Sequence, residues 1–389
     1  MEHSPIAFPN YPSEWAPTML HAAGGLCLDL AERSLREGFV LKDATPFNIM
    51  FDGARPVFLD LLSFQRQSQL ELVWRPYAQF VQTILYPLLA CRYLGMRLDE
   101  IFTVNREGLE TGRMRRLLPV WRLLTPPFFE LVTVPSLRLT GSYMPRPVAD
   151  PQEAQYIQLG LFGHLRRLLR NVTGAARTKT GVAQYADQDC PYEATAFAAK
   201  EQFVSDALQR YHPREVLDVG CNTGHFSLMA AACGASVVAI DRDTESIGLL
   251  WGKARANSAT VLPLVVDLAR PTPAMGWENG ETDSFLDRAR GRFDCVLMLA
   301  LLHHLMVTER IPLERIFQLA EELTTNLLIV EFVSPQDPQF ALLARGREAL
   351  YQDVSLPSFE AAAGRHYEIL ERAAISATRE IFTLKKKVH

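Results

Sequence analysis

Short apolar runs alternate with amphipathic stretches from about residue 189 to the C-terminus. Five runs are almost continuously apolar, as expected of parallel strands covered on both faces, and lie at 215–219, 236–241, 261–267, 293–299 and 326–333. Helices are predicted between or after them at 225–233, 245–257, 312–323 and 338–351. The runs 367–375 and 379–386 predict two adjacent strands and an antiparallel end to the sheet. This half therefore predicts an α/β domain.

The first half of the chain has a different pattern. A helix is predicted over 27–38, and apolar runs at 48–51 and 56–60 flank Asp52-Gly53, which predicts a β-hairpin. The stretch from about 73 to 174 is rich in Leu, Arg and aromatic residues and predicts helices broken at Pro87, Pro119 and Pro126-Pro127. We therefore expect a mainly helical N-terminal domain over 1–170, a linker over 171–194 and the α/β domain over 195–389.

Composition and charge narrow the function classes. With 48% hydrophobic and 22% charged residues and a net charge of −4, the chain resembles a soluble globular protein, and we expect no nucleic-acid partner. The N-terminus lacks a secretory signal, and the most apolar windows are too short to cross a bilayer, so we expect a cytoplasmic protein without a membrane partner. The six cysteines form no CxxC pair, and no metal site is expected.

A glycine-containing turn follows the first strand of the α/β domain. The segment reads Asp218-Val219-Gly220-Cys221-Asn222-Thr223-Gly224. Gly220 allows a ligand to approach the backbone, and Gly224 allows the next helix to pack closely against the strand. The Asp-x-Gly-x-x-x-Gly spacing differs from the closer glycines of a pyrophosphate-binding dinucleotide site, and it disfavours that class of ligand.

This segment resembles motif I of the class I S-adenosylmethionine-dependent methyltransferases. The resemblance covers about half of the chain and implies a Rossmann-like, seven-stranded methyltransferase sheet with S-adenosylmethionine as the cofactor. Carried over position by position, it implies that the turn residues Gly220, Cys221, Asn222 and Gly224 bind the cofactor.

Acidic residues at the strand ends strengthen the resemblance. Asp241 ends the second strand and matches the family's acidic residue that accepts hydrogen bonds from both ribose hydroxyls, as a carboxylate can without a proton of its own. Asp267 ends the third strand and matches the residue that receives the adenine amino group, with the backbone amide of Leu268 beside the ring. Asp218 matches the position near the methionine ammonium.

The end of the fourth strand supplies candidate catalytic residues. Leu302-His303-His304-Leu305 resembles a strand ending found in many small-molecule methyltransferases. A sulfonium methyl group is already electrophilic, so the enzyme must mainly align the acceptor, exclude water and remove one proton. His303 or His304 could act as that base because histidine titrates near neutral pH. Glu331, near the end of the fifth strand, is a comparable candidate, and each of the three could instead be a packed structural residue.

Three polar residues in the first half have the spacing of a phosphotransferase catalytic loop. Asp43, Asn48 and Asp60 match the aspartate, asparagine and later aspartate of protein kinases and aminoglycoside-type phosphotransferases. The stretch before Asp43 is too short for a nucleotide-covering lobe and holds no glycine-rich strand pair. The same residues also suit turns around a hairpin.

The chain also resembles, over nearly its whole length, a bacterial group of nodulation-type methyltransferases. This resemblance rests on Pro56 to Asp60, the turn at 221–224 and Thr378 to Phe382. It implies that the N-terminal domain is a substrate-binding cap in which Asp43, Asn48 and Asp60 contact the acceptor. We therefore predict methyl transfer to a small molecule, a sugar-like metabolite or a peptide-derived intermediate, with the oligomeric state left open. A phosphotransferase or bifunctional enzyme, or a non-catalytic cofactor-binding partner, are the alternatives.

Overall fold

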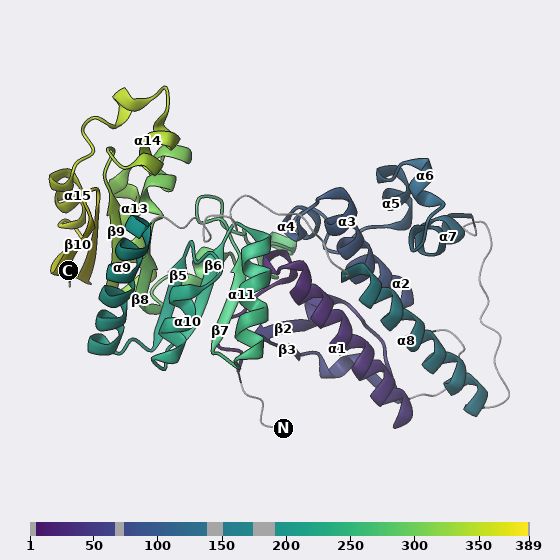
Figure 1. The fold of residues 1–389 in the computed structure, drawn as a ribbon. Coiled ribbons are helices and arrows are strands. Elements are labelled where there is room, and N and C mark those ends of the chain that lie inside the picture. The colour runs from purple at the N-terminus through teal and green to yellow at the C-terminus, as the bar shows by residue number, and fades with distance from the viewer. Residues whose placement is uncertain (1–4, 67–73, 138–150, 174–190, 388–389) are drawn as a thin grey trace. The chain divides into compact units, whose positions relative to one another are not determined.

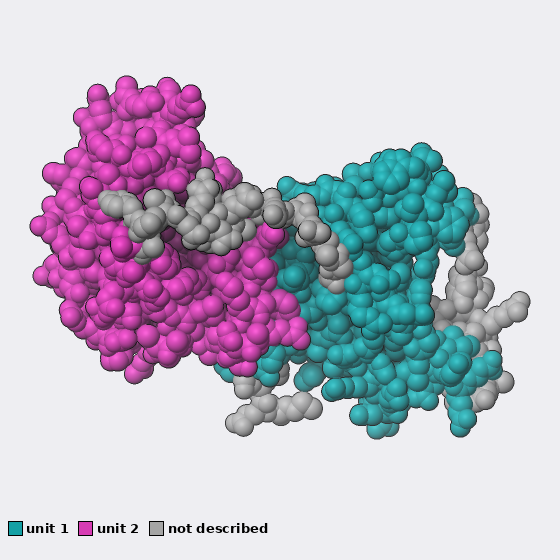
Figure 2. Space-filling view, in the orientation of Figure 1, with its two compact units in different colours: residues 1–178 teal, residues 179–389 magenta. Residues whose placement is uncertain are grey.

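The computed structural model describes residues 5–66, 74–137, 151–173 and 191–387. The chain forms two compact units, residues 1–178 and residues 179–389 (Figure 2). The expected linker over 171–194 falls mostly outside the described residues, since α8 (Pro151–Thr173) precedes the gap and α9 (Pro191–Tyr211) follows it. Among the described residues, no helix combines the length and apolarity needed to cross a membrane.

Unit 2 is built on a seven-stranded sheet, which confirms the predicted α/β fold. Its strands are β5 (Glu215–Val219), β6 (Ser236–Asp241), β7 (Val261–Val265), β8 (Phe293–Met298), β9 (Thr324–Val333), β10 (Tyr367–Ser376) and β11 (Arg379–Lys386). Their order is β10-β11-β9-β8-β5-β6-β7 (Figure 1), and β11 alone runs antiparallel to its neighbours. The strand order reverses between β5 and β8, where ligands of such sheets bind.

Helices cover both faces of this sheet. Besides α9, they are α10 (His225–Ala232), α11 (Thr244–Ala256), α12 (Phe285–Ala289), α13 (Leu313–Leu323), α14 (Pro338–Ala344) and α15 (Leu356–Ala363). Neighbouring residues of a strand point to opposite faces. On β9, Glu331 contacts Lys200 of α9, whereas the ring of Phe332 lies 5.2 Å from that of Phe359 on α15. Helices α9 and α15 therefore lie on opposite faces.

The predicted helix over 338–351 is wrong in its second half. Helix α14 ends at Ala344, and Gly346 has a φ of +77°, which a helix cannot continue. A separate 3₁₀ turn, η9 (Glu348–Tyr351), follows. Phe340, Leu343 and Ala344 of the first piece and Tyr351 of the second pack in one cluster, which explains why the sequence pattern looked continuous across the break.

The parallel strands end level with one another. Val219 is paired with Ile240 and with Met298, and Met298 is paired with Val330. Residues just beyond these positions, Gly220, Asp241 and Glu331 among them, consequently lie along one edge of the sheet. We call this edge the carboxyl rim.

Unit 1 is mainly helical and carries the predicted hairpin. Strands β2 (Ile49–Asp52) and β3 (Arg55–Phe58) form it, and β1 (Phe39–Leu41) pairs with β4 (Phe64–Arg66). Helix α1 (Pro17–Arg36) starts ten residues before the predicted position 27, through Gly24-Gly25. A Cβ at Gly24 would lie 2.8 Å from Ile84, so this glycine permits close helix packing rather than ending a helix.

The predicted break at Pro87 is absent from the structure. Helix α2 (Tyr77–Phe80), the π-helical turn η4 (Val81–Leu85) and α3 (Tyr86–Leu94) follow one another without interruption. The π turn widens the helix just before the proline, which accommodates the missing N–H and the ring. The other α and π helices described in unit 1 are α4 (Leu98–Phe102), α5 (Thr111–Leu117), α6 (Val120–Leu123), η5 (Phe129–Thr133), α7 (Val134–Leu137) and α8. Its short 3₁₀ turns are η1 (Pro12–Glu14), η2 (Pro46–Asn48) and η3 (Leu61–Ser63).

Candidate cofactor and methyl-transfer site

The turn between β5 and α10 forms the centre of the carboxyl rim. Gly220 and Gly224 have φ values of +74° and +80°, and Asn222 has one of +49°. The backbone N–H groups of Gly220 and Cys221 both donate to the carbonyl of Ile240 on β6, at 2.8 and 3.1 Å. A Cβ at Gly224 would lie 2.1 Å from Leu250 of α11. Both glycines therefore adopt a left-handed backbone, and Gly224 leaves room for Leu250 of α11 rather than for the strand contact that the sequence predicted. The predicted approach of a ligand to Gly220 stays a prediction.

Asp241 fixes the turn to the end of β6. Its carboxylate accepts the backbone N–H of Asn222 at 2.9 Å and that of Asp243 at 2.8 Å. Burial raises the pKa of Asp241, while these two N–H donors act in the opposite direction. A carboxylate has about four acceptor positions, so Asp241 retains capacity for a pair of hydroxyl donors.

Asp218 lies on β5, two residues before Gly220, and is only 3% exposed. Its Oδ2 accepts the hydroxyl of Ser227 on α10 at 2.6 Å. Burial raises the pKa of Asp218 to about 6, against the lowering effects of Ser227 and of the positive charge of Lys200. A buried carboxylate of this kind is stabilised in its charged form by a cationic ligand group.

Asp267 lies after β7, next to Asp241. The backbone N–H of Val266 donates to the carbonyl of Asp241 at 3.0 Å, which joins the two strand ends. One oxygen of Asp267 accepts the N–H of Ala269 at 3.0 Å, and the other lies 3.3 Å from the guanidinium of Arg270. Leu268 is 9% exposed. Asp267 thus already has partners on both oxygens, and an adenine amino group would have to share or replace one of them.

His303 and His304 follow β8 and have different surroundings. Their rings lie 4.4 Å apart, and His303 also stacks on Phe340 of α14. His303 is 3% exposed, and its Nδ1 is buried without a hydrogen-bond partner among the described residues. Burial lowers the pKa of His303 to about 3 and also lowers the pKa of the less buried His304. Both rings are therefore neutral at neutral pH, and burial makes each a weaker proton acceptor than a free imidazole.

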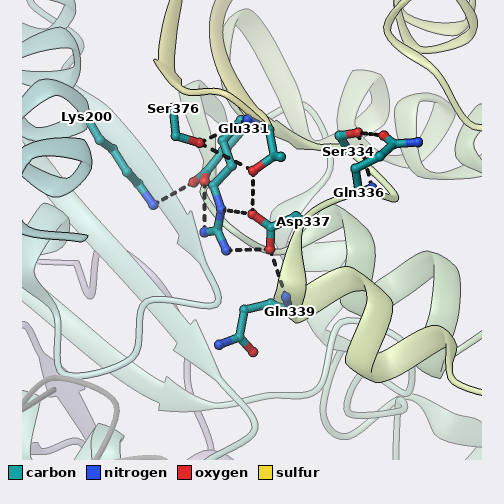
Figure 3. A network of polar contacts seen from close by, with 9 residues as sticks. Lys200, Glu331, Ser334, Gln336, Asp337, Gln339 and Ser376 are labelled. Atoms are coloured by element: carbon teal, nitrogen blue, oxygen red, sulfur yellow. Dashed lines mark hydrogen bonds and ion pairs between the residues drawn. The ribbon is translucent and has the colours of Figure 1, made fainter. Parts of the chain in front are cut away.

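Glu331 belongs to a buried network of charges (Figure 3). Its side chain lies 2.6 Å from the ammonium of Lys200 and 3.4 Å from the guanidinium of Arg379 on β11. Arg379 also contacts both oxygens of Asp337, at 2.7 and 3.0 Å, and Thr378 donates to the same carboxylate at 2.8 Å. One oxygen of Glu331 thus faces Lys200 and the other faces Arg379.

The network approaches the turn through Lys200. Its ammonium lies 5.3 Å from the centre of the Phe226 ring on α10, and its charge acts on both Asp218 and His303. The sequence pattern did not identify Lys200, Arg379 or Asp337 as site residues, because their contacts join α9, β9 and β11 and follow no local spacing. Only Asp337 carried a signal: it precedes Pro338 as a helix cap, and it accepts the N–H of Gln339.

The carboxylate acceptors of the rim suit an adenosyl sulfonium. Asp218 would hold the ammonium and Asp241 the ribose hydroxyls, while Asp267 and Leu268 would border the adenine, with Gly220 to Gly224 leaving backbone space between them. Bound there, the cofactor supplies an electrophilic methyl group. Among the described residues, no group of three or more His, Cys, Asp or Glu could hold a metal ion.

The three candidate residues of unit 1 lie around the β2–β3 hairpin. Asp60 accepts the N–H of Leu62 at 2.9 Å and the hydroxyl of Ser63 at 2.5 Å, and Asn48 donates to that hydroxyl at 3.2 Å. Ser63 therefore links Asn48 to Asp60. Asp43 lies just after β1 and is partly exposed. These contacts of Asn48 and Asp60 fit the turn-forming interpretation. Among the described residues, the side chain of Asp43 has no such local contact.

Comparison with known proteins identifies the class. Residues 192–372 match the methyltransferase domain family. Together with the strand order, this match shows that unit 2 carries an S-adenosylmethionine-dependent methyltransferase domain of class I.

Two known proteins are similar to this chain in sequence. The chain is 28% identical to nodulation protein NoeA of Rhizobium meliloti (strain 1021) over 396 residues, which cover 99% of this chain and 82% of the relative. It is also 27% identical to the O-antigen chain terminator bifunctional methyltransferase/kinase WbdD of Escherichia coli, over 40% of this chain but only 20% of that protein.

A solved structure, magnesium protoporphyrin IX methyltransferase ChlM of Synechocystis PCC 6803 with bound SAM, matches 54% of this chain and 92% of its own at 18% identity. The TM-score of 0.38 is low, and the fold assignment comes from the sheet order.

Proposed function

We propose that the methyl acceptor is a small polar molecule, sugar-like or peptide-derived, and not a nucleic acid. The net charge of −4 supports this, because phosphate neutralisation dominates nucleic-acid affinity. One relative is described as a nodulation protein, and another as a terminator of O-antigen chains, which favours a saccharide among these acceptors.

The observation that carries the cofactor site is the geometry of Asp241. Its carboxylate joins the end of β6 to the glycine turn through Asn222. We propose that Asp241 binds the ribose hydroxyls, Asp218 the methionine ammonium, and Asp267 with Leu268 the adenine, while the turn residues Gly220, Cys221, Asn222 and Gly224 border the methionine portion.

We propose that His304, rather than His303 or Glu331, accepts a proton from the acceptor. His304 is less buried than His303, whose ring packs against Phe340. Glu331 lies between Lys200 and Arg379, and we propose that it positions these two cations. The neutral His304 ring can take a proton without first losing one.

For unit 1 we propose a role in acceptor binding, with Asp43, Asn48 and Asp60 as contact residues. The sequence relationship that spans 99% of the chain supports a shared function for both units. Asp43→Asn should then raise the KM for the acceptor and leave cofactor affinity unchanged. A magnesium-dependent ATP turnover that Asp43→Asn abolishes would instead support the phosphotransferase alternative.

Calorimetry with S-adenosylmethionine tests the cofactor site. Asp241→Asn should weaken binding by roughly 10- to 100-fold, the range expected for hydrogen bonds to a charged group. Asp294→Asn is a matched control: Asp294 accepts two backbone N–H groups in the same way, those of Arg214 and Glu215, but at the opposite edge of the sheet. Equal affinities for both variants would remove the case for this site.

The acceptor class is tested with S-adenosylmethionine labelled in the methyl group. The chain is incubated with fractions of oligosaccharides, peptides and transfer RNA, and the labelled products are treated with glycosidase, protease or nuclease. We expect label that glycosidase or protease releases. Label released by nuclease alone would contradict the proposed acceptor class.

A further inference from the structure

Helix α6 exposes apolar side chains that a helix of its composition would normally bury. It has the sequence Val-Trp-Arg-Leu and buries none of these residues. Val120 is 76% exposed, Trp121 60% and Leu124, just after the helix, 67%. Full burial of such a side chain is worth about 1.5–3 kcal/mol, so an exposed group of three indicates a surface that is covered in use.

The neighbouring helices add to the same surface. Leu117 at the end of α5 is 41% exposed, Phe129 in η5 46% and Leu137 at the end of α7 72%. Figure 1 shows α5, α6 and α7 gathered together within unit 1, and η5 contacts all three. We call residues 111–137 the α5–α7 lobe.

The lobe is held in shape by interior contacts. The guanidinium of Arg122 lies 4.6 Å from the centre of the Trp121 ring and 4.8 Å from that of Tyr93 on α3. The hydroxyl of Thr133 donates to the carbonyl of Leu123 at 2.7 Å, which ties η5 to α6. The exposed apolar side chains therefore belong to an anchored element.

The charge of the lobe favours an anionic partner. Residues 111–137 contain four arginines, at 113, 115, 116 and 122, and a single acidic residue, Glu130, although the whole chain has a net charge of −4. Arg115 and Arg116 are exposed next to Leu117. Apolar side chains including tryptophan, bordered by arginines, match the surface of an anionic bilayer. A nucleic acid would satisfy the arginines but offers little to Val120 and Leu124.

We propose that the α5–α7 lobe docks on the surface of an anionic lipid bilayer, with Val120, Trp121 and Leu124 at the boundary between headgroups and acyl chains. The sequence led us to expect no membrane partner, an expectation drawn from the lack of a spanning segment. Surface docking needs no spanning segment and engages a membrane through one face of the protein.

Vesicle co-sedimentation of the full chain tests the proposal. We expect binding to vesicles that mix phosphatidylglycerol with phosphatidylcholine, weaker binding at high salt, and little binding to phosphatidylcholine alone. Replacing Val120, Trp121 and Leu124 together by Ser should reduce binding at least tenfold. Arg115→Gln with Arg116→Gln should reduce it about 25-fold, from a contribution near fivefold per arginine.

Trp277→Ser is the matched control, since Trp277 is 80% exposed in unit 2 and has no arginine beside it in the sequence. It should bind vesicles like the wild type, and circular dichroism should show all variants folded. The proposal is overturned if the wild type does not bind anionic vesicles, or if Trp277→Ser loses binding equally. It is also overturned if light scattering shows that the triple variant dissociates an oligomer, because the face would then contact a second copy.

Discussion

At the scale of single residues, His303 links stability to pH. In the unfolded chain its imidazole titrates near 6.5, whereas burial lowers the pKa in the folded chain to about 3. Between these values the unfolded state holds a proton that the folded state lacks, so the free energy of unfolding falls as pH drops below 6.5. The limiting slope is about 1.4 kcal/mol per pH unit. We expect denaturant titrations to show this slope reduced by about 1 kcal/mol per unit in His303→Asn. Equal slopes for the two proteins would contradict the burial of this ring.

Asp218 predicts a pH dependence of cofactor affinity. Its pKa in the free protein is raised to about 6, so below that pH the carboxyl is protonated and an ammonium would bind next to a neutral group. We expect the affinity for S-adenosylmethionine to fall by up to about tenfold per pH unit below pH 6. Asp218→Asn keeps an acceptor for Ser227 and should bind more weakly with little pH dependence. Calorimetry across this range is the measurement, and an unchanged pH profile in Asp218→Asn would exclude Asp218 as the titrating group.

The sequence identified some site residues and missed others for a physical reason. Asp241 and the glycine turn follow strands whose apolar runs mark where they end, so their place at the carboxyl rim was predictable. Lys200 and Arg379 reach Glu331 from α9 and β11, and only the packing of these elements on β9 brings them together. Glu331 was predicted as a candidate base, but no local pattern indicated its two cationic partners.

At the scale of elements, the strands were easier to predict than the helices. The bounds of β5 and β6 equal the predicted ranges because parallel strands covered on both faces are almost continuously apolar. The bounds of β11 also equal the prediction, although its two ends are charged. Helix ends were harder to predict from single residues. A π turn accommodates Pro87 inside a helix, and Gly24 lies inside a helix where Ile84 packs closely against it. Gly346, by contrast, follows the end of a helix and has a positive φ. The effect of a glycine or proline on a helix therefore depends on the elements packed around it.

The packing of Leu250 of α11 against the turn before α10 depends on the absence of a side chain at Gly224. An alanine there would combine the strain of a φ near +80° with a Cβ 2.1 Å from Leu250. Gly234 offers a matched control, since its φ is +94° and a Cβ there would meet nothing within 4 Å. We expect Gly234→Ala to lower the free energy of unfolding by about 1–2 kcal/mol from strain alone, and Gly224→Ala by about 1–3 kcal/mol more from overpacking. Urea denaturation measures both, and similar losses for the two variants would contradict the close packing.

At the scale of the whole molecule, the division into two units predicts that unit 2 alone binds the cofactor but does not methylate the acceptor. Asp218, Asp241 and Asp267 all belong to unit 2, whose sheet is covered by helices of the same unit on both faces. A fragment of residues 179–389 should therefore unfold cooperatively and bind S-adenosylmethionine within about threefold of the full chain, a difference of less than 1 kcal/mol. If unit 1 binds the acceptor, the same fragment should lose methyl transfer. Thermal unfolding, calorimetry and labelled-methyl transfer distinguish the outcomes. A fragment that folds but does not bind the cofactor would place part of the cofactor site in unit 1. A fragment that still methylates the acceptor would show that unit 1 is not needed for acceptor recognition.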